Sequence, residues 1–317
     1  MTKYTFLLPA YRTRFFAKAL QSIKAQTFTD FKVIVSDDCS PEDLRSIFEQ
    51  EVGDDPRFMY RRNEENLGSK SLVSHWNLLV GMCDTEYLIM ASDDDIYAPR
   101  FLEEVNELTE KYPRTNLYRA RVNRIDEKGE VFAEDSLTSS YENQVDFLFN
   151  LYCNHRLKCI GNYVFKTRAL KEKGMFLDFP LAWGSDDCAV IKMSEEGVCN
   201  TSSILFTFRC AGQNITANES RQIIRKKMKA KRQNLSFCEM YFPTIKDDGS
   251  ALSNNRLQSF KSYYLAECYE QLEKHSDVLS FKEMWYNFRY LIRHGRIPTF
   301  WVRLNFLFAW LKARQWM

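Results

Sequence analysis

The stretch Tyr87-Leu-Ile-Met-Ala-Ser-Asp-Asp-Asp-Ile-Tyr-Ala-Pro99 decides the fold, because it joins an apolar run directly to three carboxylates. Tyr87–Ala91 has the length and composition of a buried strand. Pro99 opens a helical pattern, since proline suits the first turn of a helix. In an open α/β sheet, ligands bind where strands end at their carboxyl edge. The three acids between predict a site for a hard cation, with a solvated acidic turn as the alternative.

The residues before this stretch alternate between short apolar runs and helical spacing. Strands are predicted at Tyr4–Leu8, Phe31–Ser36 and Phe58–Asn63. With the strand at Tyr87 they make four rounds of strand then helix, the rhythm of a parallel doubly wound sheet. The second strand runs into Asp37-Asp38, so we expect two groups of acids at one edge of the sheet.

Local signals place the remaining elements. Ser40-Pro41-Glu42-Asp43 predicts a helix start with Ser40 as N-cap and Pro41 in the first turn. Further along, the patterns predict strands in 115–135 around a turn at Asp126–Gly129, a helix at 144–152, a strand at Ile160–Lys166, a helix at Thr167–Lys173, a helix at Cys188–Glu196 and a last strand at Ile204–Arg209.

Length and charge divide the chain. Its 317 residues exceed the usual size of one compact core, and helical spacing replaces the earlier alternation from about Ser220. We therefore expect an α/β domain at 1–218 and a basic, aromatic-rich helical extension at 219–317. Residues 1–220 carry 26 Lys/Arg against 34 Asp/Glu (−8), and residues 221–317 carry 18 against 8 (+10). This asymmetry indicates an anionic partner for the C-terminal part.

The cysteines and the N-terminus favour a cytoplasmic protein. The nine cysteines are odd in number and include no Cys-x-x-Cys pair, which is typical of reduced thiols. The first residues show no signal peptide, and no uncharged run reaches the roughly 18 residues that span a bilayer.

Two C-terminal segments suit an anionic membrane surface. Residues 221–232 hold seven basic groups, and residues 297–317 combine Trp, Phe and Leu with Arg and Lys. Such segments predict peripheral contact with the inner face of a membrane. A solvated helix face for the first segment, and packing against the α/β domain or a partner for the second, are the alternatives. Nucleic acid is not expected, because no binding fold or stacking platform accompanies the basic residues.

Six motifs together resemble the family 2 glycosyltransferases in order and spacing. The resemblance covers about residues 3–216 and rests on Leu-Leu-Pro-Ala-Tyr (7–11), Val-Ile-Val-Ser-Asp-Asp-Cys-Ser (33–40), Asn66-Leu-Gly68, Ser-Asp-Asp-Asp-Ile-Tyr-Ala-Pro (92–99), Ser-Asp-Asp (185–187) and Phe-Arg (208–209). It implies a GT-A-like fold: a doubly wound, mostly parallel sheet flanked by helices. It also implies inverting, metal-dependent transfer from a nucleotide-diphospho-sugar, with a UDP-sugar favoured.

The resemblance assigns a nucleotide side to the site. It implies that the nucleotide is bound by Pro9, Ala10, Tyr11, Asp37 or Asp38, Asn66, Gly68, Lys70 and, at the ribose, Asp93. Ordinary turn packing is the alternative for Tyr11 and Asn66. The commoner family pattern has an aspartate where this chain has Ser92.

The resemblance also assigns the metal and the chemistry. Asp94 would hold Mn²⁺ or Mg²⁺, with Asp95 as a second ligand or a helix N-terminal acid. A divalent cation stabilises the charge that develops on a departing diphosphate. The acceptor hydroxyl needs a base. Asp187 is the first candidate and Asp186 the second, and helix N-terminal acids favoured by the helix dipole are the alternative.

Further residues are expected on the acceptor or diphosphate side. They are Trp183, Arg209 with Gln213 and Asn214, and His155 with Arg156, the last two also readable as a surface pair. The acceptor is expected to be a glycan or lipid-linked, in cell-surface polysaccharide biosynthesis.

Two other functions remain open at this point. A nucleotidyltransferase would need a Gly- and Lys/Arg-rich loop after the first strand, where this chain offers only Arg12 and Arg14. A nucleotide-sugar-binding protein without catalysis would not need the candidate acids, which are all present.

Overall fold

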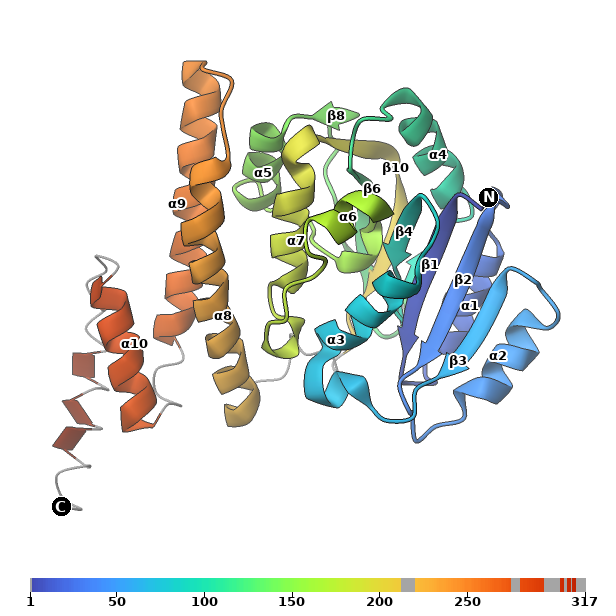
Figure 1. Cartoon of the computed structure of the whole chain (residues 1–317), viewed down its shortest axis with the longest axis horizontal. Helices are drawn as coiled ribbons and strands as arrows, with labels where there is room; N and C mark the ends of the chain where they lie inside the picture. The colour runs from blue at the N-terminus through green and yellow to red at the C-terminus, as the bar shows by residue number, and fades with distance from the viewer. Residues whose placement is uncertain are drawn as a thin grey trace.

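The computed structural model describes residues 2–211, 220–274 and 280–293, and the pairs 303–304, 307–308 and 310–311. In this part of the chain a ten-stranded mixed sheet runs in the order β3-β2-β1-β4-β9-β6-β10-β5, with β7 paired to β6 and β8 to β10. Figure 1 shows helices on both faces of this sheet and the helices α8, α9 and α10 farthest from β3.

The first half is built from strand–helix units. Its elements are β1 (Tyr4–Ala10), α1 (Phe16–Lys24), β2 (Phe31–Asp37), α2 (Leu44–Val52), β3 (Phe58–Arg62), α3 (Leu67–Met82) and β4 (Tyr87–Met90). β1 pairs in parallel with both β2 and β4, and β2 with β3. The predicted doubly wound start of the sheet is confirmed.

The second half of the sheet contains both parallel and antiparallel strand pairs. Its elements are β5 (Ile96–Tyr97), α4 (Phe101–Lys111), β6 (Leu117–Ile125), β7 (Val131–Glu134), β8 (Tyr141–Glu142), α5 (Gln144–Tyr152), η1 (Ile160–Asn162), β9 (Tyr163–Lys166), α6 (Thr167–Glu172), η2 (Pro180–Ala182), α7 (Ser185–Met193), η3 (Ser194–Glu196), β10 (Val198–Arg209), α8 (Arg221–Tyr241), η5 (Phe242–Thr244), α9 (Ala251–Lys274) and α10 (Phe281–Arg293). β9 lies antiparallel between β4 and β6, and β6 pairs in parallel with β10.

Two predicted helix starts were wrong. α2 begins at Leu44 with Asp43 as N-cap, whose carboxylate accepts from the Ser46 amide at 3.1 Å. Ser40 does not cap it: its hydroxyl donates to the Tyr11 carbonyl at 2.7 Å and accepts from the Glu42 amide at 3.0 Å, two residues before the helix begins. α7 begins at Ser185 rather than Cys188, which puts the acids of 185–187 inside the first helical turn.

Two predicted strand starts were also wrong. Residues 160–162 form η1 rather than strand, and Gly161 lies so close to Phe206 that a Cβ there would meet its ring at 2.6 Å. β10 begins at Val198, six residues before Ile204, because the polar Asn200 and Thr201 are buried between β6 and β8 with partners there.

The sheet has an apolar core on each face. Helices α1, α2 and α4 cover one face, and α3, α5, α6 and α7 cover the other together with α8 and α9. The second cluster continues into the helical extension through Met228, Leu235, Phe260 and Tyr264. A domain boundary near 218 stays a prediction, but in the described residues the extension shares its core with the sheet.

The structure describes the first of the two basic C-terminal segments and only a small part of the second. Residues 221–232 lie in α8, where Arg225 pairs with Glu283 of α10 at 3.3 Å. Most of 297–317 lies outside the described residues. In the described part, no helix combines the length and apolarity that crossing a bilayer requires. The nine cysteines, all described, are free.

Candidate active site

The segments after β1, β2 and β4 meet at the carboxyl edge of the sheet. The Asp93 Oδ2 atom, after β4, accepts from the amides of Tyr11 and Arg12, after β1, at 2.8 and 2.9 Å. The Asp38 amide, after β2, donates to the Ala10 carbonyl at 2.9 Å. The two groups of acids therefore gather at one edge, as the sequence predicts, with Pro9 and Ala10 in the strand that joins them.

Asp37 and Asp38 have different surroundings. Asp37 is fully buried, accepts from the Tyr60 hydroxyl at 2.7 Å and pairs with Arg62. These contacts tie it to β3. Asp38 accepts from the amides of Leu67 and Gly68, at 2.9 and 2.7 Å, at the start of α3. Asp38 therefore orders the loop that enters α3.

The start of α3 is tightly built. Asn66 is its N-cap and accepts from the Ser69 amide at 2.7 Å, a contact that stabilises a helix N-terminus. A Cβ on Gly68 would lie 2.8 Å from Asp38 Oδ2, so only glycine fits there without displacement. Lys70 is exposed and pairs with Glu65 at 2.6 Å.

The three acids after β4 point to different partners. Asp93 binds the two amides after β1, and Asp95 accepts from the Arg209 amide at 3.1 Å. The Ser92 hydroxyl lies 2.6 Å from Asp94 Oδ1 and 2.7 Å from Asp95 Oδ2. Burial, and to a smaller extent the charge of Asp94, raises the pKa of Asp93 to about 6. Burial and then Asp94 raise the pKa of Asp95 well above its usual value.

Asp94 is the acid of this group that fits a metal. Within the described residues, no three His, Cys, Asp or Glu side chains are arranged to hold a metal ion. Asp94 is half-buried, and its Oδ2 atom has no hydrogen-bond partner among those residues. Mg²⁺ is commonly held by one or two carboxylates together with substrate phosphates. The residues therefore fit a cation shared between Asp94 and a diphosphate, but not a cage made by the protein alone.

Arg209, which is expected on the diphosphate side, lies beside the acids. It is buried, its Nε donates to the Asp94 carbonyl at 3.1 Å, and its guanidinium lies 4.3 Å from the centre of the Phe15 ring. The residues predicted to accompany it, Gln213 and Asn214, lie outside the described residues.

A second pair of carboxylates stands in the first turn of α7. Asp187 Oδ1 accepts from the Tyr152 hydroxyl at 2.8 Å and lies 3.8 Å from Lys158 Nζ. Burial and then the charge of Asp187 raise the pKa of Asp186 to about 7. An acid that titrates near pH 7 is well matched to proton transfer at neutral pH.

The charges of both acidic groups act on Cys159, which precedes η1. Burial and then Asp95 raise the pKa of this thiol, and Asp186 adds to the effect. α3 provides a second link: the Ser71 hydroxyl donates to Asp178 at 2.6 Å, just before η2 and α7. Figure 1 agrees, because α3 and α7 both begin at the edge where β1 and β2 end. The start of α3, which Asp38 orders, is thus tied to the segment that leads into α7.

A match to a protein family accompanies this geometry. The family model described as Glycosyl transferase family 2 matches residues 5–174, more than half of the chain. The chain belongs to glycosyltransferase family 2. A curated relative, an uncharacterized glycosyltransferase of Haemophilus influenzae, is 30% identical over 113 residues, 35% of this chain and 36% of the relative. The match thus spans about a third of that relative's length.

Solved structures are similar over nearly the whole length of this family 2 glycosyltransferase. S. aureus TarS 1–349 in complex with UDP aligns with a TM-score of 0.59 at 13% identity, over 99% of this chain and 92% of that one. The complex of the same chain with UDP-GlcNAc gives 0.58 at 13% identity, over 94% and 93%. The predicted GT-A-like fold is confirmed.

Trp183 and His155 contact the helical extension. The Trp183 ring lies 4.5 Å from Lys227 Nζ, and its Nε1 atom is 3.5 Å from Gln271 Oε1. His155 is exposed, and its Nδ1 lies 3.3 Å from the Tyr263 hydroxyl. In the family 2 glycosyltransferase both residues are therefore placed where the α/β part meets α8 and α9.

Sequence reasoning missed Tyr152 and Lys158. Tyr152 ends an apolar helix and resembles any core residue there, and Lys158 stands in a loop without a motif. No signal in the sequence pairs either one with Asp187, because the contact joins positions 29 or more residues apart.

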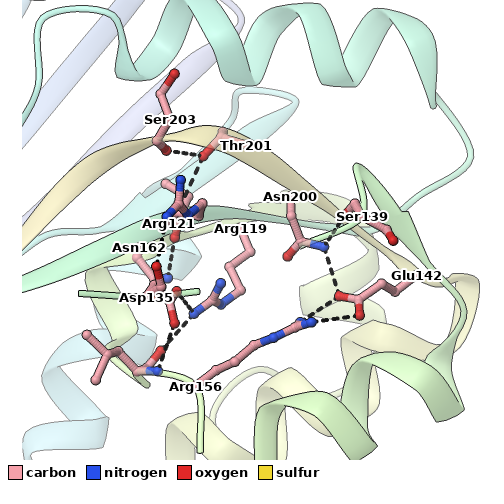
Figure 2. A network of polar contacts seen from close by, with 12 residues as sticks. Arg119, Arg121, Asp135, Ser139, Glu142, Arg156, Asn162, Asn200, Thr201 and Ser203 are labelled. Carbon is pink, nitrogen blue, oxygen red and sulfur yellow. Dashed lines mark hydrogen bonds and ion pairs between the residues drawn. The ribbon is translucent and has the colours of Figure 1, made fainter. Parts of the chain in front are cut away.

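A buried polar network holds the loop that carries Lys158 (Figure 2). Arg119 and Asp135, both fully buried side chains, form an ion pair, and each also bonds the backbone of Leu157. Arg156 pairs with Glu142 at 2.6 Å, which also accepts from Asn200 at 2.9 Å. The network fixes the two residues before Lys158 and so fixes where its ammonium group approaches Asp187.

Proposed function

We propose that this chain transfers a sugar from a nucleotide-diphospho-sugar to an acceptor hydroxyl, with inversion at the anomeric carbon. The observation that carries the proposal is the presence of two acidic groups, one after β4 beside Arg209 and one in the first turn of α7, where Tyr152 and Lys158 lie against Asp187. Such an arrangement suits a donor diphosphate at the first group and an acceptor at the second. Family membership and the GT-A-like fold support it.

The donor side of the proposal uses the strand edge. Tyr11, which is exposed, and Asp38 would contact the base, and Asp93 the ribose. The TarS structures contain UDP and UDP-GlcNAc, which favours a UDP-sugar here. Asp94 would hold Mn²⁺ or Mg²⁺ with the diphosphate, and the cation would stabilise the charge on the departing UDP. Arg209 lies next to that position.

The acceptor side uses α7. The carboxylate of Asp187, oriented by Tyr152 and Lys158, would take the proton of the acceptor hydroxyl. The acceptor oxygen then forms a bond to the anomeric carbon while the bond from that carbon to phosphate breaks. The electron pair leaves with the diphosphate, so one displacement inverts the configuration. Asp186 is the second candidate for the base.

The acceptor and the location complete the proposal. A growing glycan or a lipid-linked acceptor in cell-surface polysaccharide assembly fits a cytoplasmic enzyme with basic C-terminal segments.

Removing residues 297–317 should weaken co-sedimentation with anionic vesicles but not with neutral ones. Equal co-sedimentation before and after removal would contradict membrane contact.

Calorimetry with UDP, GDP, dTDP and CMP, each with and without Mn²⁺, tests the donor side. We expect UDP to bind best, and Asp94→Ala to abolish the effect of Mn²⁺ on its affinity. Asp84→Ala is the matched control, because Asp84 lies at the opposite end of β4. If Mn²⁺ changed the UDP affinity of the Asp94 variant as it does that of the wild type, Asp94 would not be a metal ligand.

Release of UDP from UDP-GlcNAc, with water as the acceptor, tests the base. Asp187→Asn should retain UDP affinity and lose turnover by roughly 10²–10⁴-fold. Asp146→Asn is the control, since Asp146 also lies in a first helical turn, in α5. Near-normal turnover in the Asp187 variant would show that another residue is the base.

A further inference from the structure

Arg209, the last residue of β10, is a buried arginine to which the proposed chemistry gives no role of its own. Only 2% of its surface is exposed, so its guanidinium acts on the groups that it touches rather than on a ligand in solution. Its backbone amide donates to Asp95 Oδ1 at 3.1 Å, and its Nε donates to the Asp94 carbonyl at 3.1 Å. One residue of β10 thus holds two residues of the turn after β4.

The turn that carries the acids lies between two strands that fix its ends. Before the turn, the Ala91 amide donates to the Leu7 carbonyl of β1 at 2.8 Å. After the turn, β5 pairs antiparallel with β10, with Ile96 opposite Thr207. Arg209 follows Thr207 by two residues on β10. The strand that fixes the far end of the turn therefore also supplies the guanidinium that contacts its middle.

Asp94 is held by both its main chain and its carboxylate. The Ser92 hydroxyl lies 2.6 Å from Asp94 Oδ1, and Arg209 donates to the Asp94 carbonyl. In the part of the chain that the structure describes, Asp94 Oδ2 has no hydrogen-bond partner. These contacts fix the residue and keep one carboxylate oxygen available to a cation.

The ring of Phe15 covers the guanidinium of Arg209. The Arg209 Cζ atom lies 4.3 Å from the centre of that ring. A guanidinium is attracted to the face of an aromatic ring, and an aliphatic side chain of similar size offers no such face. At the other end of the group, Arg209 Nη1 donates to the Asp126 carbonyl at 3.4 Å. The ring and this carbonyl together orient the Nε of Arg209 toward Asp94.

Phe15 is itself held in place by the start of α1. It is the N-cap residue of that helix, and the next residue, Phe16, is fully buried in the core. The Phe15 carbonyl accepts from the Ala19 amide at 3.1 Å. Two residues earlier, the Thr13 amide donates to Glu42 Oε2 at 2.7 Å. The ring therefore stands on an ordered loop and helix start, which suits a fixed support for the guanidinium.

We propose that Phe15 and Arg209 are positioning residues for the metal ligand Asp94. The ring holds the guanidinium, and the guanidinium holds the main chain of Asp94, so that its carboxylate is in place before the cation and the diphosphate arrive. The proposal rests on the assignment of Asp94 to the metal in the proposed function. It gives Arg209 an action through Asp94 rather than a direct contact with the diphosphate.

Phe15→Leu tests this through calorimetry with UDP, in the presence and absence of Mn²⁺. The factor by which Mn²⁺ raises UDP affinity should fall roughly threefold or more, because the leucine cannot hold the guanidinium. The affinity without Mn²⁺ should not change. Phe15→Tyr, which keeps the ring, should keep the wild-type factor. Phe58→Leu is the matched control, because Phe58 is also half-buried and faces an arginine, Arg57, at the amino end of β3.

A double-variant cycle tests whether Phe15 acts through Arg209. Arg209→Met should reduce the Mn²⁺ factor at least as much as Phe15→Leu does. In the Arg209→Met background, Phe15→Leu should then cause no further loss, because two residues that act through one contact are not additive. Fully additive losses would overturn the proposal.

Other roles of the two residues would give different results. If Phe15→Leu lowered UDP affinity by the same factor with and without Mn²⁺, the ring would support the loop in general, and the proposal would be overturned. ¹⁵N NMR of the wild-type chain needs no variant that folds poorly. The Arg209 Nε–H signal should be shifted upfield by the ring and should exchange slowly with water. An unshifted, rapidly exchanging signal would also overturn the proposal.

Failure of the proposed function would look different again. If Mn²⁺ had no effect on UDP affinity in the wild type, the metal assignment would be wrong and this inference would be wrong with it. If the wild type showed the effect and Asp94→Ala abolished it, but Phe15→Leu kept it in full, the metal assignment would stand. The role of Phe15 and Arg209 alone would then be overturned.

Discussion

Asp186 is a candidate site residue whose charged form the folded chain disfavours. Its pKa is raised to about 7 by burial and by Asp187, whereas an unfolded chain would titrate it near 3.8. The folded state therefore holds a proton that the unfolded state has lost between these values. Stability contributed by this group is present below about pH 4 and is lost as the pH rises to about 7.

We predict that Asp186→Asn stabilises the fold at pH 8. The amide removes a charge that the site disfavours, so the free energy of unfolding should rise by on the order of 2 kcal/mol. The gain should disappear near pH 4. Urea unfolding at both values measures it, with Asp146→Asn as the control. A gain of the same size at pH 4 and pH 8 would contradict the electrostatic origin.

Gly68 makes a second prediction for a single residue. In Gly68→Ala the new Cβ would lie 2.8 Å from Asp38 Oδ2, and Asp38 is held by Asn63 and Leu67 and cannot easily give way. We expect UDP affinity to fall roughly tenfold, about 1.4 kcal/mol. Gly81→Ala is the control, because a Cβ there meets nothing. Equal affinity in both variants would separate Asp38 from nucleotide binding.

At the scale of elements, parallel strands were predictable and irregular segments were not. β1, β2 and β4 are apolar runs ending in turn or acidic residues, and that pattern alone identifies a buried strand and its edge. One of the two wrong helix starts lies where a side chain bonds a distant segment. Ser40 bonds the loop after β1 instead of capping α2.

In the candidate site, too, local sequence predicts some features, and others depend on residues that are distant in the chain. The sequence places Asp93, Asp94 and Asp95 at a strand end, and the structure has them there. Their separate roles depend on Arg209 and on the amides after β1, which are distant in the chain. The partners of Asp187, Tyr152 and Lys158, depend likewise on the packing of α5 and of the loop before η1.

The network in Figure 2 predicts a large effect of breaking one ion pair. Asp135→Ala leaves the fully buried Arg119 without its carboxylate, so the free energy of unfolding should fall by about 3–5 kcal/mol. Glu172→Ala is the control: it removes a solvent-exposed pair with Arg168, which should contribute little to stability. Equal losses in urea unfolding would show that the buried pair contributes no more than a surface pair.

At the scale of the molecule, the shared core links the two predicted regions. α8 and α9 cover α5 and α7 with Met228, Phe260 and Tyr264, which belong to the apolar cluster of the sheet. An extension docked in this way stabilises the part that it covers.

We therefore predict that residues 1–218 alone do not form the native domain. Without α8 and α9, the apolar faces of α5 and α7 would meet water. The fragment should bind the dye ANS and lose its cooperative thermal transition. A chain ending at residue 293, which keeps α8, α9 and α10, is the control. A cooperative transition in the shorter fragment would show that the first region folds independently.

The place of β9 has a consequence for synthesis of the chain on the ribosome. Among the described strands, only β9 joins β4 to β6. Until residues 163–166 leave the exit tunnel, the nascent first half therefore ends in an open hydrogen-bonding edge at β4. Unpaired edges of this kind recruit other strands. Stalling translation just before residue 163 should therefore yield chains that associate, whereas stalling after β10, when β9 covers β4 and β10 covers β6, should not.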